Sequence, residues 1–460
     1  MPGQYRILHL SDIHFRQKCN GNVVLHDDVR NELFHDASKV REELGDADAV
    51  VVTGDIAYSG RREEYEEAGD WLDQLCGAVG CPEHSVQVIP GNHDINWSEV
   101  TPTVEDLHAR ITNAHPNELD ARISERFHND KVAYSALLAK FGNYREFANR
   151  YGKDFDSGEH PYWADDIRGL GPPVIRVIGM NTVLFSGKGD VKGKLALGQN
   201  QYTTLRRISD IEYMILLHHP PEWFKDNEKA LNYFENRARI WLMGHEHTLR
   251  VNRSANMQGF ERLEVHAGAV CPQTEDGYEF RYNWLTLSVS ATEAGYKLIV
   301  VFWPRVWTFA STEFVADTNR LQGQEHKDFS LLLSGETAEM VLDGRTEANE
   351  DHIVPSLVDP DVEEPSKSEG RQCIARGDRG FRRLQFLFWR KLDRNQRVHV
   401  LAELNMLPED FQMPPVWLRR GLDAARHQGR LRELWDTVMS HLPVEQREPN
   451  PFERRTQTDA

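Results

Sequence analysis

The sequence predicts an α/β protein that carries a small all-α domain towards its C-terminal end. Short apolar runs rich in β-branched residues alternate with helical patterns from residue 5 to about residue 303, and this order is typical of strands interleaved with helices. An acidic segment containing proline and serine interrupts the pattern at 335–370. Amphipathic helical spacing returns after it. A chain of 460 residues, 40% of them hydrophobic, is long enough for one large core and a second, smaller unit.

The first part of the chain contains a series of predicted strands, each a short apolar run between turn-forming residues. They are residues 5–10, 49–53, 86–89, 174–180, 213–217, 239–243, 262–266, 283–290 and 297–303. Apolar residues recur at helical spacing from Val29 to Leu44, and again from Tyr65 to Val79. We therefore expect two helices that pack against the sheet.

Changes in composition divide the chain into segments. We assign 1–310 to the α/β domain, about 103–150 within it to a polar helical insertion beside the site, and 311–334 to an extension of that domain. We assign 335–370 to an acidic flexible linker, 371–445 to a helical module and 446–460 to a tail, of which we expect 452–460 to be disordered. Within the module, apolar residues recur at helical spacing in several short segments. This spacing predicts a small bundle of helices.

The composition disfavours several classes of protein. No apolar run approaches the roughly 18 residues that span a bilayer, and a strand pattern begins almost at the N-terminus, so we expect neither a membrane anchor nor a signal peptide. The five cysteines are scattered and lack the spacing of a zinc or redox motif, which fits a cytoplasmic protein. A net charge of −18 disfavours a protein that coats nucleic acid through charge, but it does not exclude an enzyme whose bound cations attract phosphate locally.

Five polar motifs follow directly after predicted strands. They are Ser11-Asp12-Ile13-His14, Thr53-Gly54-Asp55, Pro90-Gly91-Asn92-His93-Asp94, His218-His219-Pro220 and Gly244-His245-Glu246-His247. Ligand sites of open α/β sheets gather at strand ends, so we expect these motifs to meet. In an extended chain, residues two apart point the same way, so Asp12 with His14, and His245 with His247, each present a pair of donors on one side. Such pairs suit metal ions. Nitrogen and oxygen donors without a thiolate suit manganese, iron, cobalt or zinc.

The ordered series Asp-x-His, Gly-Asp, Gly-Asn-His-Asp, His and Gly-His-x-His resembles the full motif set of the calcineurin-like metallophosphoesterase superfamily. The resemblance covers the first predicted domain and implies a four-layer αββα sandwich, in which two sheets pack face to face with helices outside. It also implies two divalent metal ions, for which we favour manganese. The implied ligands are Asp12, His14 and His247 for the first ion, Asn92, His218 and His245 for the second, and Asp55 as the bridge. Between His218 and His219, the family pattern favours His218, which leaves His219 to form hydrogen bonds nearby.

This resemblance implies a hydrolase of phosphate esters. Two cations lower the pKa of water from about 15.7 toward about 7 and stabilise charge on the phosphoryl oxygens, so a metal-activated hydroxide attacks phosphorus. His93 would act as the general acid for the leaving oxygen, and Asp94 would orient His93 and favour its protonated form. A phosphodiester, either a cyclic nucleotide or a nucleic-acid strand, is slightly favoured over a monoester. Arg16 lies close enough to the first motif to meet a phosphate, although a solvated arginine is the commoner case.

Two alternatives remain open on the sequence. The helical module resembles the death-fold-like adaptor modules of bacterial conflict-system effectors in its helix spacing. A chain with such a module could be a nuclease effector of a defence system, directed by a protein partner or by self-association. Arginines and aromatic residues alternate in 376–397, which could form a nucleic-acid face, but a solvated helix face explains the pattern more simply. The non-enzymatic alternative is a metal-stabilised interaction scaffold, and the intact ligand set together with His93 argues against it.

Overall fold

Two β-sheets packed face to face form the centre of the first of two units, Met1–Glu339 and Met340–Ala460. The first sheet has the order β14-β13-β12-β1-β4-β5, with β15 also paired to β13, and the second has the order β10-β11-β9-β8-β7-β6. The structure is a computed structural model. It describes residues 3–333 except 20–21, 24–25, 156–159, 273–278 and 293–294, and beyond them 381, 383–384, 387–388, 391–392, 394–406, 422, 424–426 and 428–452.

The strands of both sheets begin and end as follows. In the first sheet they are β1 (Gln4–Leu10), β4 (Ala49–Val52), β5 (Val86–Val88), β12 (Arg281–Thr292), β13 (Gly295–Thr308), β14 (Glu313–Ala316) and β15 (Lys327–Leu332). In the second they are β6 (Tyr162–Ile167), β7 (Val174–Met180), β8 (Ile211–Leu217), β9 (Ala238–Met243), β10 (Arg250–Ala255) and β11 (Glu261–His266). A small ribbon of β2 (Lys18–Cys19) and β3 (Asn22–Val23) follows β1.

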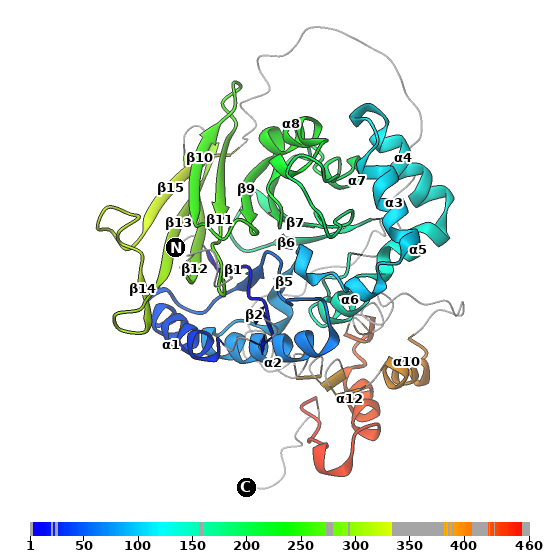
Figure 1. The fold of residues 1–460 in the computed structure, drawn as a ribbon. Helices are drawn as coiled ribbons and strands as arrows, with labels where there is room; N and C mark the ends of the chain where they lie inside the picture. The colour runs from blue at the N-terminus through cyan, green and yellow to red at the C-terminus, as the bar shows by residue number, and fades with distance from the viewer. Residues whose placement is uncertain are drawn as a thin grey trace. The chain divides into compact units, whose positions relative to one another are not determined.

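Helices cover the outer faces of both sheets (Figure 1). Two long helices, α1 (Asp27–Leu44) and α2 (Arg62–Val79), pack on the first sheet, and α7 (Gln199–Tyr202) and α8 (Asn227–Arg237) pack on the second. The predicted insertion contains α3 (Pro102–Thr112), α4 (Pro116–Asn129), α5 (Lys131–Ala139) and α6 (Gly142–Asn149). The predicted four-layer αββα sandwich is confirmed.

The central strands are buried on both faces. In β1, Ile7 points into the core between the two sheets, whereas Leu8 points into the core beneath α1 and α2. Val51 and Val52 of β4 divide in the same way. Side chains alternate between the faces of a strand, so a strand with apolar residues at every position needs a packed layer on each side.

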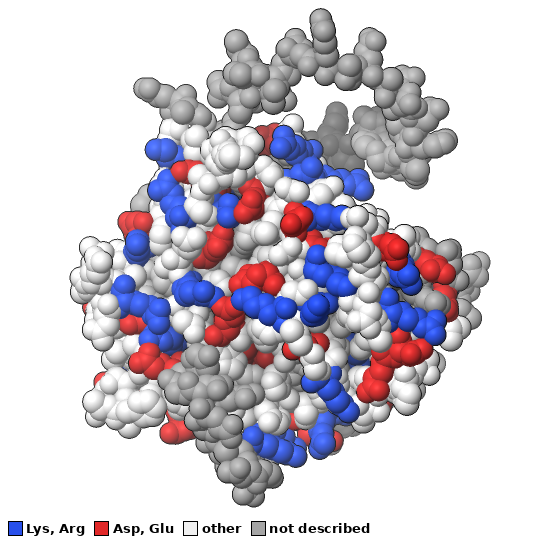
Figure 2. Space-filling model, turned by 45° about the horizontal axis from the view of Figure 1, so that its top comes forward, with Lys and Arg blue, Asp and Glu red and all other residues white. Residues whose placement is uncertain are grey.

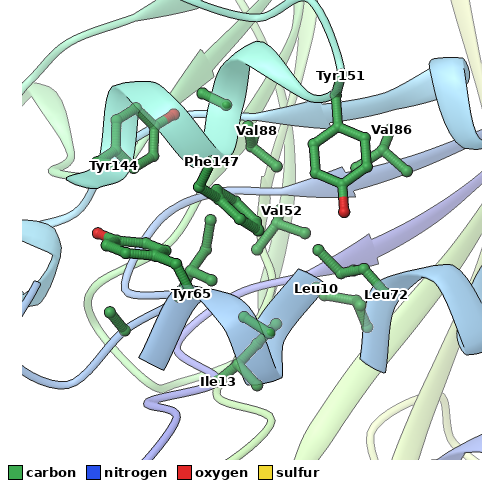
Figure 3. Close-up of a cluster of buried hydrophobic side chains, with 14 of the residues drawn as sticks. Leu10, Ile13, Val52, Tyr65, Leu72, Val86, Val88, Tyr144, Phe147 and Tyr151 are labelled. Atoms are coloured by element: carbon green, nitrogen blue, oxygen red, sulfur yellow. The ribbon is translucent and has the colours of Figure 1, made fainter. Parts of the chain in front are cut away.

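One part of the outer core fixes the position of a site loop. Tyr65 of α2 packs against Phe147 of α6, with ring centroids 5.1 Å apart, and against Tyr144, at 6.2 Å (Figure 3). The hydroxyl of Tyr65 donates a hydrogen bond to Oδ1 of Asp94 at 2.9 Å. The helical insertion and α2 are therefore packed together directly behind the Asn92–Asp94 motif.

The predicted strands and the two predicted long helices are all present, but edge strands were missed. The main omissions are β6 and β10, the outermost strands of the second sheet, and β14 and β15 in the first. Residues of β10 are mostly exposed, in the sequence Arg-Val-Asn-Arg-Ser-Ala. An edge strand buries little, so its sequence carries little hydrophobic pattern.

The second unit has a small core of its own. Its described helices include α10 (Arg394–Glu403) and α12 (Leu431–Ser440). The core contains Phe381, Leu384, Leu387, Phe388, Val400, Leu401, Leu404, Leu422, Leu434, Trp435 and Val438. The predicted linker at 335–370 lies outside the described residues, as do residues 407–421 of the predicted helical module.

Residues 446–452 of the segment assigned to the tail are described. Phe452 packs against the core of the second unit, with its ring 6.0 Å from that of Trp435. The indole of Trp435 also donates a hydrogen bond to the carbonyl of Glu448 at 3.3 Å. Trp435 therefore holds the segment from Glu448 to Phe452 against the core of the second unit.

The arginines whose side chains are described in 376–397 have partners within the module. The Arg383 guanidinium pairs with the Glu448 carboxylate, and Nε of Arg397 donates to the carbonyl of Phe388 at 3.1 Å. The side chains of Arg379, Arg382, Arg390 and Arg394 lie outside the described part. These pairings favour the solvated helix face over a nucleic-acid face.

Charge on the exterior is mixed in sign. On the face shown in Figure 2, basic and acidic side chains are interspersed. Among the described residues on this face, the basic side chains do not gather into one large surface of the kind that binding nucleic acid by charge requires. Among the described residues, no helix is both long enough and apolar enough to cross a bilayer.

Candidate active site

The first site loops are joined through their backbones. The amides of Asp12 and His14, after β1, donate to the carbonyls of Gly54 and Asp55, after β4, at 3.1 and 3.0 Å. The amide of Cys271 in turn donates to the carbonyl of Asp12 at 3.0 Å. Because β1 and β4 are parallel neighbours, their carboxyl ends share one edge of the sheet. This shared edge places the first two motifs side by side.

The backbone at the site is strained. Asp12, His14, Asp55, His245 and His247 all have positive φ, between 50 and 68°. Non-glycine residues rarely adopt this region, and each such residue costs about 1–3 kcal/mol. Such strain persists only where the surrounding structure compensates for it, and strained residues often cluster at functional sites.

Two glycines allow the loops to approach closely. A Cβ atom at Gly91 would lie 2.1 Å from Oδ1 of Asp55, and one at Gly54 would lie 2.4 Å from Nδ1 of His218. Gly54 also has a φ of +97°. Either glycine replaced by alanine would therefore push apart two of the motifs.

The first predicted ligand group is assembled. Asp12, His14 and His247 each offer a donor atom within 4.8 Å of the others. Nε2 of His247 lies 3.2 Å from Oδ1 of Asp12, and Nε2 of His14 lies 3.3 Å from Oδ2 of Asp55.

The second group lies on the other side of Asp55. Nε2 of His218 is 3.4 Å from Oδ2 of Asp55 and 3.1 Å from Oδ1 of Asn92. The ring of His245 is 5.1 Å from that of His218. The same oxygen of Asp55 therefore contacts a histidine of each group, as a bridging carboxylate requires.

Hydrogen bonds to carbonyls set the tautomers of two of these histidines. Nδ1 of His14 lies 3.1 Å from the carbonyl of Cys271, and Nδ1 of His218 lies 2.8 Å from that of Thr53. A carbonyl only accepts, so Nδ1 carries the proton and Nε2 keeps its lone pair for a ligand. The arrangement of buried carboxylates and imidazole lone pairs fits divalent metal ions.

The pKa of Asp55 depends on burial and on the histidines around it. Burial raises the pKa of Asp55, but His218 and His93 outweigh it, and the pKa ends well below its ordinary value. An ionised carboxylate at 1% exposure needs cationic partners. A pair of metal ions would supply them.

His93 is held by groups that the sequence did not indicate. Its Nδ1 lies 2.8 Å from the carbonyl of Tyr58, its ring stacks on that of Tyr58 at 5.3 Å, and its amide donates to Oδ1 of Asp55 at 2.8 Å. The carbonyl fixes the proton at Nδ1, so Nε2 is the nitrogen that can exchange a proton. Burial lowers the pKa of His93, and the charge of Asp55 opposes that change.

The expectation that Asp94 orients His93 is not what the structure shows. The Asp94 carboxylate accepts hydrogen bonds from the amides of Ile56, Ala57 and Gly91 at 3.2, 2.8 and 2.8 Å, and from the Tyr65 hydroxyl. Burial and the charge of Asp55 raise the pKa of Asp94 to about 7, against these donors. Asp94 therefore ties the loop after β4 to the Asn92–Asp94 motif, and the Tyr58 carbonyl takes the orienting role.

We expect Asp94→Ala to destabilise the fold by about 3 kcal/mol or more, because it leaves three buried amides without an acceptor at about 1–3 kcal/mol each. Urea denaturation would measure the loss. Tyr65→Phe is the matched control, since it removes one donor to the same carboxylate and should cost about 1 kcal/mol. Equal stability of Asp94→Ala and the unmodified protein would contradict this structural role.

The remaining predicted residues have different surroundings. The Arg16 guanidinium is exposed and pairs with Glu67 of α2 at 2.6 Å, so it faces a carboxylate. His219 was expected to form hydrogen bonds nearby. Its amide donates to Oγ1 of Thr182 at 3.1 Å, and the Thr182 carbonyl interacts with its ring and opposes the fall in pKa that burial causes. Trp223, which no motif indicated, lies with its ring centroid 4.4 Å from that of His245.

Comparisons with known proteins agree with this geometry. Residues 5–249 match the family model of calcineurin-like phosphoesterases, and residues 380–440 match that of the GTPase-associated adaptor domain. An uncharacterized metallophosphoesterase-like protein, YydB of Bacillus subtilis (strain 168), is 25% identical over 305 residues, which are 64% of this chain and 59% of YydB. The chain therefore spans less than two thirds of this relative.

Two further similarities are shorter or more distant. Glycerophosphodiester phosphodiesterase GpdQ of Enterobacter lignolyticus (strain SCF1) is 39% identical over 88 residues, 19% of this chain and 29% of GpdQ. The solved structure of purple acid phosphatase PPD1 from yellow lupin (Lupinus luteus) is 13% identical, with a TM-score of 0.39, and the match covers 72% of this chain and 54% of PPD1. On the match at residues 5–249, which is more than half of its length, the chain belongs to the calcineurin-like phosphoesterase family.

Proposed function

We propose that this chain hydrolyses phosphodiesters at a centre of two divalent metal ions. Its ligands would be Asp12, His14 and His247 for the first ion, Asn92, His218 and His245 for the second, and Asp55 between them. The observation that carries the proposal is the position of Asp55, whose Oδ2 lies 3.3 Å from Nε2 of His14 and 3.4 Å from Nε2 of His218.

The chain's own residues would prepare and complete the reaction. When bound, two such ions lower the pKa of water and neutralise charge on phosphoryl oxygens. Asp55 would hold the two ligand groups together, and its Oδ1 accepts a hydrogen bond from the amide of His93 at 2.8 Å. His93, with its Nδ1 proton directed to the Tyr58 carbonyl, would donate a proton from Nε2 to the leaving oxygen.

One observation supports a diester over a monoester. GpdQ, named as a glycerophosphodiester phosphodiesterase, is similar to this chain over 88 residues. His93, with its ring 4.8 Å from that of His14, lies beside the ligand groups, where it could protonate the alkoxide leaving group of either class of ester, so the similarity to GpdQ alone carries the preference for a diester.

The test is a hydrolysis panel with manganese, in which bis-p-nitrophenyl phosphate, p-nitrophenyl phosphate, cyclic AMP and single- and double-stranded DNA are compared. We expect kcat/KM to be higher for the diesters than for p-nitrophenyl phosphate. Repeating the panel with zinc and cobalt separates a wrong metal from a wrong activity. Absence of turnover with every substrate and metal, in protein that retains two metal equivalents, would favour the scaffold alternative.

A second candidate role concerns the C-terminal module. The match to a GTPase-associated adaptor domain supports a module that recruits a protein partner or a second copy of the chain. Under this proposal the chain is an effector, and the module directs its phosphoesterase domain to a target. The activity would be that of a nuclease if the DNA substrates are cleaved.

The free state of the buried Cys76, Cys81 and Cys271 fits a reducing cytoplasm.

We expect a truncated chain that ends at Ser334 to keep two metal equivalents and to hydrolyse bis-p-nitrophenyl phosphate at close to the full-length rate. Every proposed ligand precedes this cut, and β15 remains paired to β13. A chain that ends at Gly323 is the control, because it loses Phe329 and Leu331 from the core between the sheets and should aggregate. Loss of metal from the longer truncation would show that the module belongs to the catalytic core.

A further inference from the structure

The proposed ligand set leaves one buried histidine without a role. The His219 side chain is fully buried after β8, and its backbone amide donates to Oγ1 of Thr182 at 3.1 Å. The Thr182 carbonyl interacts with the ring and opposes the fall in pKa that burial causes, although neither ring nitrogen has a hydrogen-bond partner of good geometry among the residues that the structure describes. A neutral imidazole has one donor and one lone pair, and a carbonyl can meet only the donor. The lone pair of the other nitrogen is therefore left for a group other than these residues.

The surroundings of His219 indicate what it meets. Its ring centroid lies 4.2 Å from that of His245 and 5.0 Å from that of His218. One nitrogen from each of the three histidines can be chosen so that all lie within 4.8 Å of one another. The Trp223 ring packs at 5.0 Å from His219 and limits the space into which that imidazole can turn.

We propose that His219 is a further ligand of the second metal ion, so that three imidazoles, those of His218, His219 and His245, face that ion. This inference rests on the proposed two-metal centre and deepens it. With Asp55 and Asn92 the second ion would have five protein donors. An octahedral ion would then keep one position open.

The added imidazole changes the metal preference of the second position. Three nitrogen donors favour zinc, cobalt or iron(II) over manganese, because affinity at nitrogen-rich sites rises along that series of metals. The first position, with Asp12 and Asp55 as oxygen donors beside two histidines, has fewer nitrogen donors and should show this preference less strongly. We therefore expect the two positions to differ in metal, and the second to select zinc over manganese.

His219→Phe in the full-length protein tests the proposal. Phenylalanine keeps a flat ring between His245 and Trp223 but offers no nitrogen. We expect calorimetric titration with zinc to show an unchanged affinity for the first equivalent and an affinity for the second that is at least about tenfold weaker. Loss of a group that only hydrogen-bonds to a metal ligand already weakens metal binding by about tenfold or more. The preference for zinc over manganese at that equivalent should fall as well.

His26→Phe is the matched control. His26 is buried, its Nε2 lacks a hydrogen-bond partner among the described residues, its ring packs against Phe280 at 5.4 Å, and it belongs to none of the proposed ligand groups. Its replacement should leave both zinc affinities unchanged. A second zinc affinity in His219→Phe within twofold of the unmodified protein would overturn the proposal.

A crystal structure of the zinc-loaded, unmodified protein decides the point if His219→Phe does not fold. We expect a nitrogen of His219 at about 2.0–2.1 Å from the second ion. A water between them, or a ring turned away, would overturn the role of His219 while leaving the metal centre intact. Fewer than two zinc ions in the unmodified protein would instead refute the proposed two-metal centre itself.

Discussion

Asp55→Ala should abolish hydrolysis and lower the occupancy of both metal positions. Its carboxylate is the only proposed ligand shared by both groups, and its Oδ2 contacts His14 and His218. Its Oδ1 also accepts a hydrogen bond from the amide of His93 at 2.8 Å, so the same change removes one of the contacts that hold His93, the proposed general acid. Elemental analysis of the purified variant and turnover of bis-p-nitrophenyl phosphate would measure the two effects.

Two further variants test whether the loss of metal and activity comes from the missing carboxylate of Asp55. Asp55→Asn keeps an oxygen at the bridging position but removes the negative charge, and we expect it to retain more metal than Asp55→Ala while remaining poorly active. Asp46→Ala removes an exposed carboxylate that pairs with Arg41 and should behave as the unmodified protein. Two full metal equivalents with normal turnover in Asp55→Ala would show that Asp55 is not the bridge.

The sequence predicted the centre of the fold better than its edges. In β1 and β4, apolar residues occupy consecutive positions because both faces are covered, and this makes a strong signal. The exposed strand β10 has charged and polar residues at most positions and is held mainly by backbone pairing to β11. Backbone pairing leaves little trace in side-chain patterns, so such a strand is found only when its neighbour is known.

At the site, side chains were predictable where a motif fixes residue type, and their supports were not. The Tyr58 carbonyl orients His93, and the Cys271 carbonyl sets the tautomer of His14. Every residue has a carbonyl, so no residue type marks these contacts. The role of Asp94 was misassigned for a related reason, since adjacency to His93 in the chain suggested a contact, whereas the turn directs Asp94 to the amides of Ile56, Ala57 and Gly91.

His93→Ala should keep both metal ions and slow hydrolysis by about 10²–10⁴, the usual contribution of a general acid. The loss should depend on the leaving group. The ribose oxygen of cyclic AMP leaves poorly without a proton, whereas p-nitrophenolate is stable as an anion and needs little help. We therefore expect a large loss in kcat/KM for cyclic AMP or another alkyl diester, and a small one for bis-p-nitrophenyl phosphate. His84→Ala, at a histidine outside the ligand groups, is the control and should change neither rate.

The dependence on leaving group separates the roles open to His93. His93 also lies in a group with His14 and Asp55 whose donor atoms fall within 4.8 Å, so a ligand role is the main alternative to proton donation. A lost ligand would lower metal content and slow both esters, because the ions act on the phosphoryl group whatever leaves. A residue that only binds phosphate would slow both esters equally with metal retained. Only a proton donor held through Nδ1 by the Tyr58 carbonyl, at 2.8 Å, gives retained metal together with a loss that grows as the leaving group becomes more basic.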